Sequence, residues 1–335
     1  MAQAPVLQVN NLKTHFFTRS GIVKAVDGVT FSLNAGETLG IVGESGSGKS
    51  MTALSIMGLV PQPAGKIVEG EILFNGDDLV QKTQSELQRI RGRDICMILQ
   101  DPMTSLNPVF SVGNQVIETV KQSMAQTGET LKERAIDLLH KVRIAAPESR
   151  IDNFPHQMSG GMRQRVVGAI AIAGSPQVLI ADEATTSLDA TIQYQYLELL
   201  KELQRDTGMA IIFITHDMGV IWEMCNSVAV MYASEIVETA PTETLFARPA
   251  HPYTEALLSA APVPDPNVEQ NLLRLEGAVP TMRERFPGCF FASRCPRKLG
   301  SICDDSPPPA QETGEGNGHV INCHIPVKEL SLVQS

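Results

Sequence analysis

The chain has 335 residues, enough for about two domains of roughly 150 residues each. Apolar residues make up 43% of the chain and charged residues 19%, so a large hydrophobic core is expected and a disordered chain is excluded. The formal net charge of −10 argues against a dedicated nucleic-acid-binding protein, because such proteins usually carry a basic surface.

No stretch reaches the roughly 18 apolar residues that a membrane-spanning helix needs. The first residues also lack the basic and apolar regions of a signal peptide. We therefore expect a protein that stays in the cytoplasm and reaches a membrane only through partners.

The N-terminal part of the chain is predicted to form strands followed by a loop and a helix. Alternating apolar residues predict strands at Val6–Val9 and Gly28–Leu33, and the short apolar run Thr38–Val42 predicts a third. A Gly-rich loop follows this run. Helical character then extends over Ser50–Leu59 and stops near Pro61.

That loop has the sequence Gly-Glu-Ser-Gly-Ser-Gly-Lys-Ser and fits the phosphate-binding pattern G-x-x-x-x-G-K-[ST]. Its glycines let backbone N–H groups point at phosphate oxygens, and the next helix offers its positive end to the same charge. Lys49 is expected to reach the β- and γ-phosphates of a nucleotide, and Ser50 to bind Mg²⁺. The predicted nucleotide ligands here are Gly43, Ser45, Gly46, Ser47, Gly48, Lys49, Ser50 and Thr52.

A polar block at about residues 101–165 follows, in which Leu131–Val142 has the apolar spacing of a helix. Continuous apolar runs at Val178–Ala181 and Ala210–Ile214 predict buried strands, and Ile192–Leu203 between them predicts a helix. The order predicts an α/β fold, a phosphate-loop NTPase core with an inserted helical subdomain.

Two carboxylates follow the buried strand at 178–181. Asp182 stands at the strand end, where a carboxylate beside a phosphate loop suits Mg²⁺ coordination. Glu183 comes next and is the candidate general base that polarises the attacking water.

The segment Met158-Ser-Gly-Gly-Met162 resembles the signature sequence of ABC ATPases, usually Leu-Ser-Gly-Gly-Gln. Methionine stands at its first and last positions, whereas the phosphate-contacting Ser159, Gly160 and Gly161 are intact. The resemblance covers residues 1 to about 245 and implies an ABC-type ATP hydrolase with ATP and Mg²⁺.

The resemblance also assigns single residues by their order in the chain. Gln100 resembles the glutamine that senses Mg²⁺ and the nucleophilic water, and His216 resembles the switch histidine that contacts the γ-phosphate. Asp189, in Ser187-Leu-Asp189, resembles the D-loop aspartate. Phe16 resembles the aromatic residue that stacks on adenine, with Phe17 as a competing candidate and a plain core residue as the alternative.

One position departs from the family pattern. Ala184 stands where a proline usually follows the glutamate, and we expect a slightly looser turn there with hydrolysis retained.

Three stretches resemble the ATP-binding subunits of bacterial dipeptide and oligopeptide importers. They are the extended segment Gln100–Pro108, the element His251-Pro-Tyr-Thr254 and a four-cysteine tail. From the residues alone, His251–Thr254 predicts only a turn that opens a helix over Tyr253–Ala260.

This resemblance implies a peripheral subunit on the cytoplasmic side of the inner membrane. Its implied partners are a second ATPase subunit in a heterodimer, two transmembrane permeases and an extracytoplasmic substrate-binding protein. Each ATP lies between the phosphate loop of one ATPase and the signature of the other, so Ser159, Gly160 and Gly161 should serve the partner's nucleotide.

Other functions stay open at this stage. They are an importer for nickel or sugars, a soluble ABC ATPase of DNA repair or translation, and a nucleotide-binding module without turnover. The single set of ATPase motifs and the negative net charge disfavour a soluble ATPase of DNA repair or translation. The retained Glu183 disfavours a nucleotide-binding module without turnover. The sequence does not identify the transported substrate, because the permeases and the binding protein would select it.

The amino-acid composition changes from about Pro241. We therefore place a domain boundary near residue 245, with an ATPase domain at 1–245 and an extension at 246–335.

Four cysteines lie late in that extension, with five, seven and nineteen residues between them: Cys289, Cys295, Cys303 and Cys323. Such thiolates bind Zn²⁺ or a [4Fe–4S] cluster, and free or disulfide-bonded cysteines are the third alternative. The resemblance favours the cluster. Cys96 and Cys225 are expected in the core.

Overall fold

The computed structural model describes residues 4–99, 105–123, 130–186, 188–260, 277–280, 282, 286–314 and 318–330. The chain divides into two compact units that each combine separate segments of sequence. The first comprises Met1–Leu7, Ser32–Thr38 and Leu73–Ile214, and the second comprises Gln8–Phe31, Leu39–Ile72 and Thr215–Ser335. The boundary that the sequence predicts near residue 245 concerns modules along the chain and stays a prediction.

The first unit has three parallel strands in the order β8-β7-β6, at Ala210–Thr215, Val178–Asp182 and Ile95–Ile98. Every residue of β7 and β8 is buried, which agrees with the two continuous apolar runs. Parallel strands covered on both faces favour such runs. Cys96 on β6 is 4% exposed, so its prediction as a core residue is confirmed.

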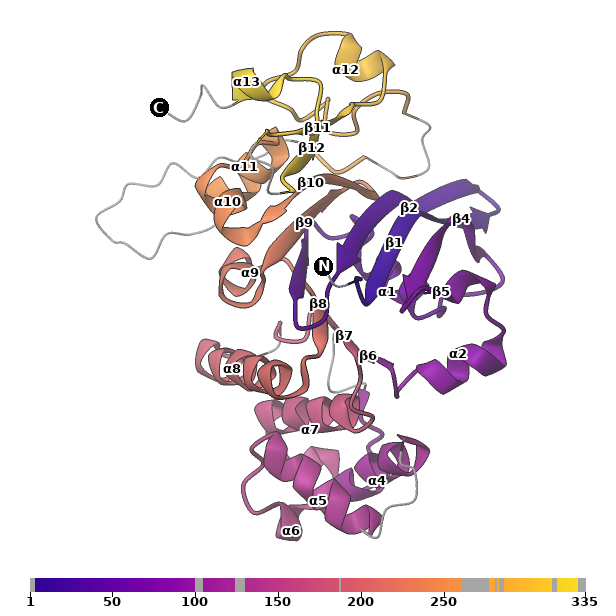
Figure 1. Ribbon diagram of the computed structural model, residues 1–335, viewed down its shortest axis with the longest axis vertical. Helices are drawn as coiled ribbons and strands as arrows, with labels where there is room; N and C mark the ends of the chain where they lie inside the picture. The colour runs from indigo at the N-terminus through magenta and orange to yellow at the C-terminus, as the bar shows by residue number, and fades with distance from the viewer. Residues whose placement is uncertain are drawn as a thin grey trace, which may run out of the picture. The chain divides into compact units, whose positions relative to one another are not determined.

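Helices make up most of the rest of this unit, and α4, α5 and α7 pack on one another, with α6 against α5 (Figure 1). Thr130 caps α5 through a reciprocal bond with Glu133, which explains where this helix begins. The helices are α2 Gln84–Ile90, α4 Val112–Ser123, α5 Leu131–Lys141, α6 Pro147–Arg150, α7 Gly160–Ile172 and α8 Ala190–Thr207, with the short β5 Asp77–Asp78 and single turns η1 Leu79–Gln81 and η2 Pro155–Gln157.

The second unit has strands in the order β11-β12-β10-β9-β3, of which β3 and β9 are parallel and the other pairs antiparallel. Their bounds are β3 Thr38–Val42, β9 Ser227–Tyr232, β10 Glu235–Pro241, β11 Ala310–Glu312 and β12 Val320–Asn322. The strands β2-β1-β4 belong to a second sheet, at Gly21–Leu33, Leu7–Thr18 and Gly65–Phe74.

The C-terminal strands β11 and β12 therefore extend the same sheet that holds β3, the strand before the phosphate loop. Glu238 on β10 pairs with Ile321 on β12. The helices here are α1 Lys49–Ile56, α9 Met218–Met224, α10 Thr242–Ala247, α11 Pro252–Ser259, α12 Ile302–Asp305 and α13 Val327–Leu330. Cys225, after α9, is 8% exposed, which confirms a core position.

In the described residues, no helix is long and apolar enough to cross a membrane.

Candidate nucleotide site

The phosphate loop follows the fully buried strand β3, as the sequence predicts, and leads directly into α1. Three of its glycines have positive φ: 158° at Gly43, 80° at Gly46 and 103° at Gly48. A side chain at Gly48 would also come within 2.5 Å of the carbonyl oxygen of Ala25. Because both the backbone angle and the space require glycine there, the loop can wrap tightly around an anion.

Lys49 is buried and reaches back across the loop. Its Nζ donates to the carbonyl oxygen of Gly43 at 2.8 Å and to that of Glu44 at 3.1 Å. Ser47 Oγ is buried without a hydrogen-bond partner among the described atoms, whereas Thr52 Oγ1 donates to Gly48 O. A buried ammonium and a buried hydroxyl inside a glycine loop are the groups that a phosphate-binding site requires.

The start of α1 is open. Its cap residue Gly48 provides no side-chain cap, and Ser50 and Ser45 are exposed. The first turn of a helix directs its N–H groups toward an anion bound at the helix start, and Ser50 stands where Mg²⁺ coordination is predicted.

Two anchors for this loop come from far along the chain. The backbone N–H of Glu44 donates to the hydroxyl of Tyr253 at 2.9 Å, and Arg294 Nη1 lies 3.1 and 3.0 Å from the two carboxylate oxygens of Glu44. Tyr253 is the second residue of α11, and its N–H donates to Nδ1 of the cap residue His251 at 3.1 Å. Burial lowers the pKa of His251 to about 4. A neutral imidazole at this position keeps its acceptor for the helix cap.

Phe16 and His216 belong to the same unit as the loop. Phe16 is half-buried, and its ring lies against Gly65, where an added side chain would meet it at 2.8 Å. Phe17 is 47% exposed. His216 is exposed and precedes Asp217, which caps α9 by accepting from Gly219 N and Val220 N.

The carboxylates lie in the other unit, at the end of β7. Asp182 is buried, and Glu183 is half-buried with a φ of 48°. Its N–H donates to the carbonyl oxygen of Ile214 at 2.9 Å, which fixes this turn to β8. A left-handed conformation in a residue other than glycine is strained, and such strain occurs often at functional sites.

Sequence reasoning missed one residue beside this pair. Gln164 is fully buried on α7, and its Nε2 donates to the carbonyl oxygen of Ala184. It ties the turn that carries Glu183 to the helix of the signature segment. Gln164 stands between Arg163 and Arg165 in the sequence, so no local pattern marks it as buried.

The signature residues begin α7. Ser159 caps the helix, and its hydroxyl accepts from the Met162 N–H at 3.3 Å. Gly160 is exposed with open space beside it, whereas a side chain at Gly161 would come within 2.6 Å of Ile192 on α8. Asp189 caps α8 in the same way, accepting from Ile192 N at 3.0 Å. Exposed N–H groups at the α7 start suit an anion.

Gln100 and Ser187 lie outside the described residues. In the second unit, the loop and the start of α1 hold most of the predicted residues, with Phe16 on β1 and His216 after β8. Those of the first unit lie at the end of β7 and at the starts of α7 and α8. Their predicted roles toward ATP and Mg²⁺ stay predictions.

All four late cysteines lie in the second unit, and each thiol is within electrostatic range of the other three. Burial raises the pKa of Cys289 to about 12 and also raises the pKa of Cys295 and Cys323. In the parts of the chain that the structure describes, no three Cys, His, Asp or Glu side chains are placed to hold a metal ion.

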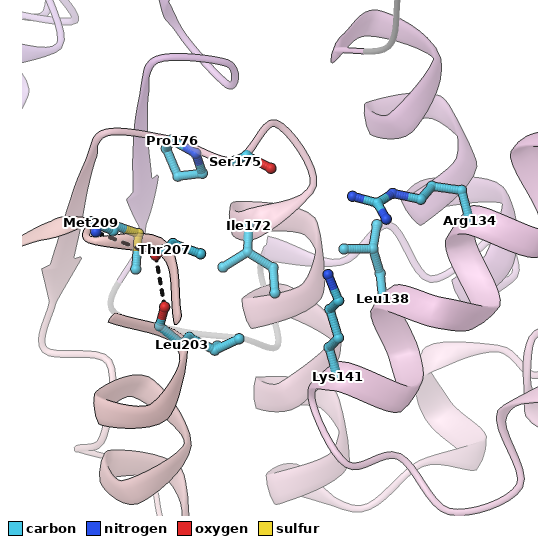
Figure 2. Close-up of a pocket in the computed structure, with 9 residues that line it drawn as sticks. All are labelled: Arg134, Leu138, Lys141, Ile172, Ser175, Pro176, Leu203, Thr207 and Met209. Atoms are coloured by element: carbon cyan, nitrogen blue, oxygen red, sulfur yellow. Dashed lines mark hydrogen bonds between the residues drawn. The ribbon is translucent and has the colours of Figure 1, made fainter. Parts of the chain in front are cut away.

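A pocket in the first unit is lined by none of the residues predicted to bind the nucleotide. Figure 2 shows apolar side chains and two cations of α5 around it, and none of the predicted nucleotide residues. It is lined by Arg134, Leu138, Lys141, Ile172, Ser175, Pro176, Leu203, Thr207 and Met209.

A phosphate loop, a strand-end Asp-Glu pair and a capped signature helix together define an ABC-type ATPase. Comparisons with known proteins agree. Residues 26–186 match the ABC transporter family, and residues 237–303 match the C-terminal region of oligopeptide/dipeptide transporters.

Curated relatives are similar over nearly the whole chain. A probable peptide ABC transporter ATP-binding protein of Sinorhizobium fredii is 47% identical over 93% of both chains. The oligopeptide transport ATP-binding protein AppD of Bacillus subtilis is 46% identical, covering 90% of this chain and 92% of that one. The dipeptide transport protein DppD of the same organism is 45% identical over 96% and 94%.

Among solved structures, the dimeric bacterial ABC transporter cassette MJ0796 matches with a TM-score of 0.63 and 26% identity, over 70% of this chain and 98% of that one. The protein belongs to the family of peptide ABC transporter ATP-binding subunits, and it is an ATP hydrolase.

Proposed function

We propose that this protein powers the import of di- or oligopeptides by hydrolysing ATP on the cytoplasmic side of the inner membrane. The observation that carries the proposal is the His251-Pro-Tyr253 element, which is built into the second unit and bonded to the phosphate loop. The match of residues 237–303 to the oligopeptide/dipeptide transporter C-terminal region supports it.

In the proposed complex the protein pairs with a second, different ATPase. Two transmembrane permeases and an extracytoplasmic binding protein complete the importer. Two ATP molecules lie between the subunits, each held by the phosphate loop of one and the signature of the other. The exposure of Ser159 and Gly160 at the start of α7, with Gly161 next to them, supports a role of these three residues toward the partner's ATP.

At its own site, Lys49 and the amides at the start of α1 hold the β- and γ-phosphates. Ser50, Gln100 and Asp182 would hold Mg²⁺, which would neutralise phosphate charge. Glu183 accepts the proton of the attacking water, His216 contacts the γ-phosphate, and Phe16 stacks on adenine. Closure of the pair drives the permeases outward-facing, and hydrolysis resets them.

The cargo is tested by uptake into vesicles. Importer reconstituted with its ATPase subunits facing the lumen should accumulate labelled di- or oligopeptides inside ATP-loaded vesicles, and uptake should be lost in the Lys49→Ala variant. Uptake of nickel or a sugar without competition by peptides would refute peptide import and favour the related importers.

We also propose that the cysteines hold one [4Fe–4S] cluster with a structural role. The four thiols lie close enough for the charge on one to affect the pKa of the others. The sulfurs of Cys289, Cys295 and Cys323 each accept a hydrogen bond from the backbone N–H two residues further along the chain. Burial disfavours bare thiolates, so a cation that they bind would stabilise the charged form. Amide-to-sulfur bonds are typical of such clusters.

Anaerobic purification tests this assignment. We expect a brown protein with about four irons per chain, and a Ser replacement of any one of the four cysteines should bleach it while ATP binding survives. Zinc in place of iron would refute the cluster and leave a structural zinc site. No metal at all would leave free or disulfide-bonded cysteines.

A further inference from the structure

Glu44, the second residue of the phosphate loop, is held at three points. Its N–H donates to Tyr253 at 2.9 Å, its carboxylate faces Arg294 at 3.0 Å, and its carbonyl oxygen accepts from Lys49 Nζ at 3.1 Å. Lys49 is the residue expected to grip the phosphates. The conformation of Glu44 is therefore connected directly to the position of that ammonium.

The Arg294 guanidinium is itself fixed. Its side chain is 6% exposed, and besides Glu44 it donates to the Tyr232 hydroxyl at 3.2 Å. It also lies over the Tyr232 ring, 5.8 Å from the centroid. A guanidinium with so little freedom forms its ion pair at low entropic cost, unlike a long side chain at the surface.

Tyr253 is held by aromatic packing. Its ring centroid lies 4.7 Å from that of Tyr232 and 5.5 Å from that of Phe291, and Tyr232 and Phe291 are 5.3 Å apart. All three side chains are almost completely buried. The hydroxyl of Tyr253 is thereby aimed at one point, the Glu44 N–H.

Both anchors come from the C-terminal region rather than from the phosphate motif. Phe291 and Arg294 lie between Cys289 and Cys295, and Cys289 N donates to the carbonyl oxygen of Cys303 at 2.8 Å. The segment that carries Arg294 is thus part of the cysteine-bearing fold.

The charge on Glu44 explains why an anchor is needed. A carboxylate on a loop that binds a polyanion repels the ligand, and Arg294 offsets that charge. We propose that Arg294 and Tyr253 are positioning residues of the phosphate loop, so that the C-terminal extension sets the affinity of this subunit for ATP. The proposal rests on ATP binding at this loop.

The test measures binding of a fluorescent ATP analogue with Mg²⁺ to the full chain. Arg294→Met should raise the Kd about tenfold, because it leaves Glu44 unpaired beside the phosphates. Arg294→Lys should recover part of the loss. Adding Glu44→Gln to Arg294→Met should bring the Kd back to within about threefold of the wild type, since the repelling charge is gone. Tyr253→Phe should cost about threefold.

Arg297→Met is the matched control. Arg297 lies three residues on and pairs with Glu255 of α11, and among the described residues it has no hydrogen bond or ion pair with the phosphate loop. It should leave the Kd unchanged. In the assembled importer, Arg294→Met should raise the KM for ATP with kcat within about twofold, as expected when ground-state binding alone is lost.

The proposal is overturned if Arg294→Met binds ATP as the wild type does. It is also overturned if Arg297→Met weakens binding equally, because the extension would then act only through its general stability. Failure of the wild-type chain to bind ATP at all would instead refute the proposed function.

Discussion

Glu238→Gln should loosen the C-terminal extension from the ATPase core. The carboxylate of Glu238 is buried and accepts three hydrogen bonds: from Ala250 N at 2.8 Å, from His251 N at 2.9 Å and from His319 Nε2 at 2.7 Å. Two of these meet at one oxygen, and the His251 N–H meets the other. In the glutamine variant, the amide oxygen can accept the bonds from Ala250 N and His319 Nε2. The amide NH₂ group then faces the His251 N–H, so that two donors meet.

One buried N–H is left without an acceptor, which costs about 1–3 kcal/mol. Loss of the charge on the acceptor weakens the other two bonds, so the total loss should be about 2–4 kcal/mol. The affected amides are those that begin α11, the helix that carries Tyr253 to the phosphate loop.

Hydrogen exchange followed by mass spectrometry is the suitable assay, because it reports the stability of α11 separately from that of the rest of the chain. Exchange at the start of α11 should accelerate by about 30-fold or more. Glu243→Gln, at an exposed position of α10, is the control and should change exchange little. Unchanged protection of α11 in Glu238→Gln would show that this buried carboxylate does not hold the junction.

Three further results are expected. Gly161→Ala should lower the free energy of unfolding by about 1–2 kcal/mol, because its methyl group would press on Ile192, whereas Gly160→Ala should lower it little; equal denaturation midpoints would contradict this packing. Burial, with the charge of Asp27 added, raises the pKa of Glu235 to about 7 from 4.5, so the folded state keeps a proton that the unfolded state loses, and stability falls as pH rises between these values. Glu235→Gln should therefore gain about 1–3 kcal/mol over the wild type at pH 8 and almost nothing at pH 4, measured by denaturation at both; an equal gain at both would refute the assignment. The isolated chain should bind Mg-ATP but hydrolyse it slowly, and fast turnover by a demonstrated monomer would overturn the shared site.

The sequence was most informative where function depends on adjacent residues. The strand, loop and helix around Lys49 were predicted because glycine spacing and the apolar run lie within one short segment. Buried strands β7 and β8 were predicted nearly to their ends, since continuous apolar runs of this length specify a covered sheet. Strand β2 begins at Gly21 rather than Gly28, because its first half is mostly half-buried and lacks the alternation of exposed and buried residues that runs from Gly28 to Leu33.

Contacts between distant residues were beyond prediction. The helix after His251 was expected. The hydrogen bond from the Glu44 N–H to the Tyr253 hydroxyl was not, because it joins residues 209 positions apart. Nothing in the local pattern of Tyr253 or Arg294 distinguishes a loop anchor from a core aromatic or a surface cation. Strands β11 and β12 were also missed, because each has only three residues and is specified by pairing rather than by its own sequence.

The most direct test of the central claim is ATP turnover by the assembled importer with Glu183→Gln in this subunit. The amide keeps the shape of the carboxylate but cannot accept a proton from water. ATP binding should be retained, the closed pair should accumulate, and hydrolysis at this site should fall by about 100-fold or more. Hydrolysis at this site close to the wild-type rate, in an intact complex, would contradict the assignment of Glu183 as the general base.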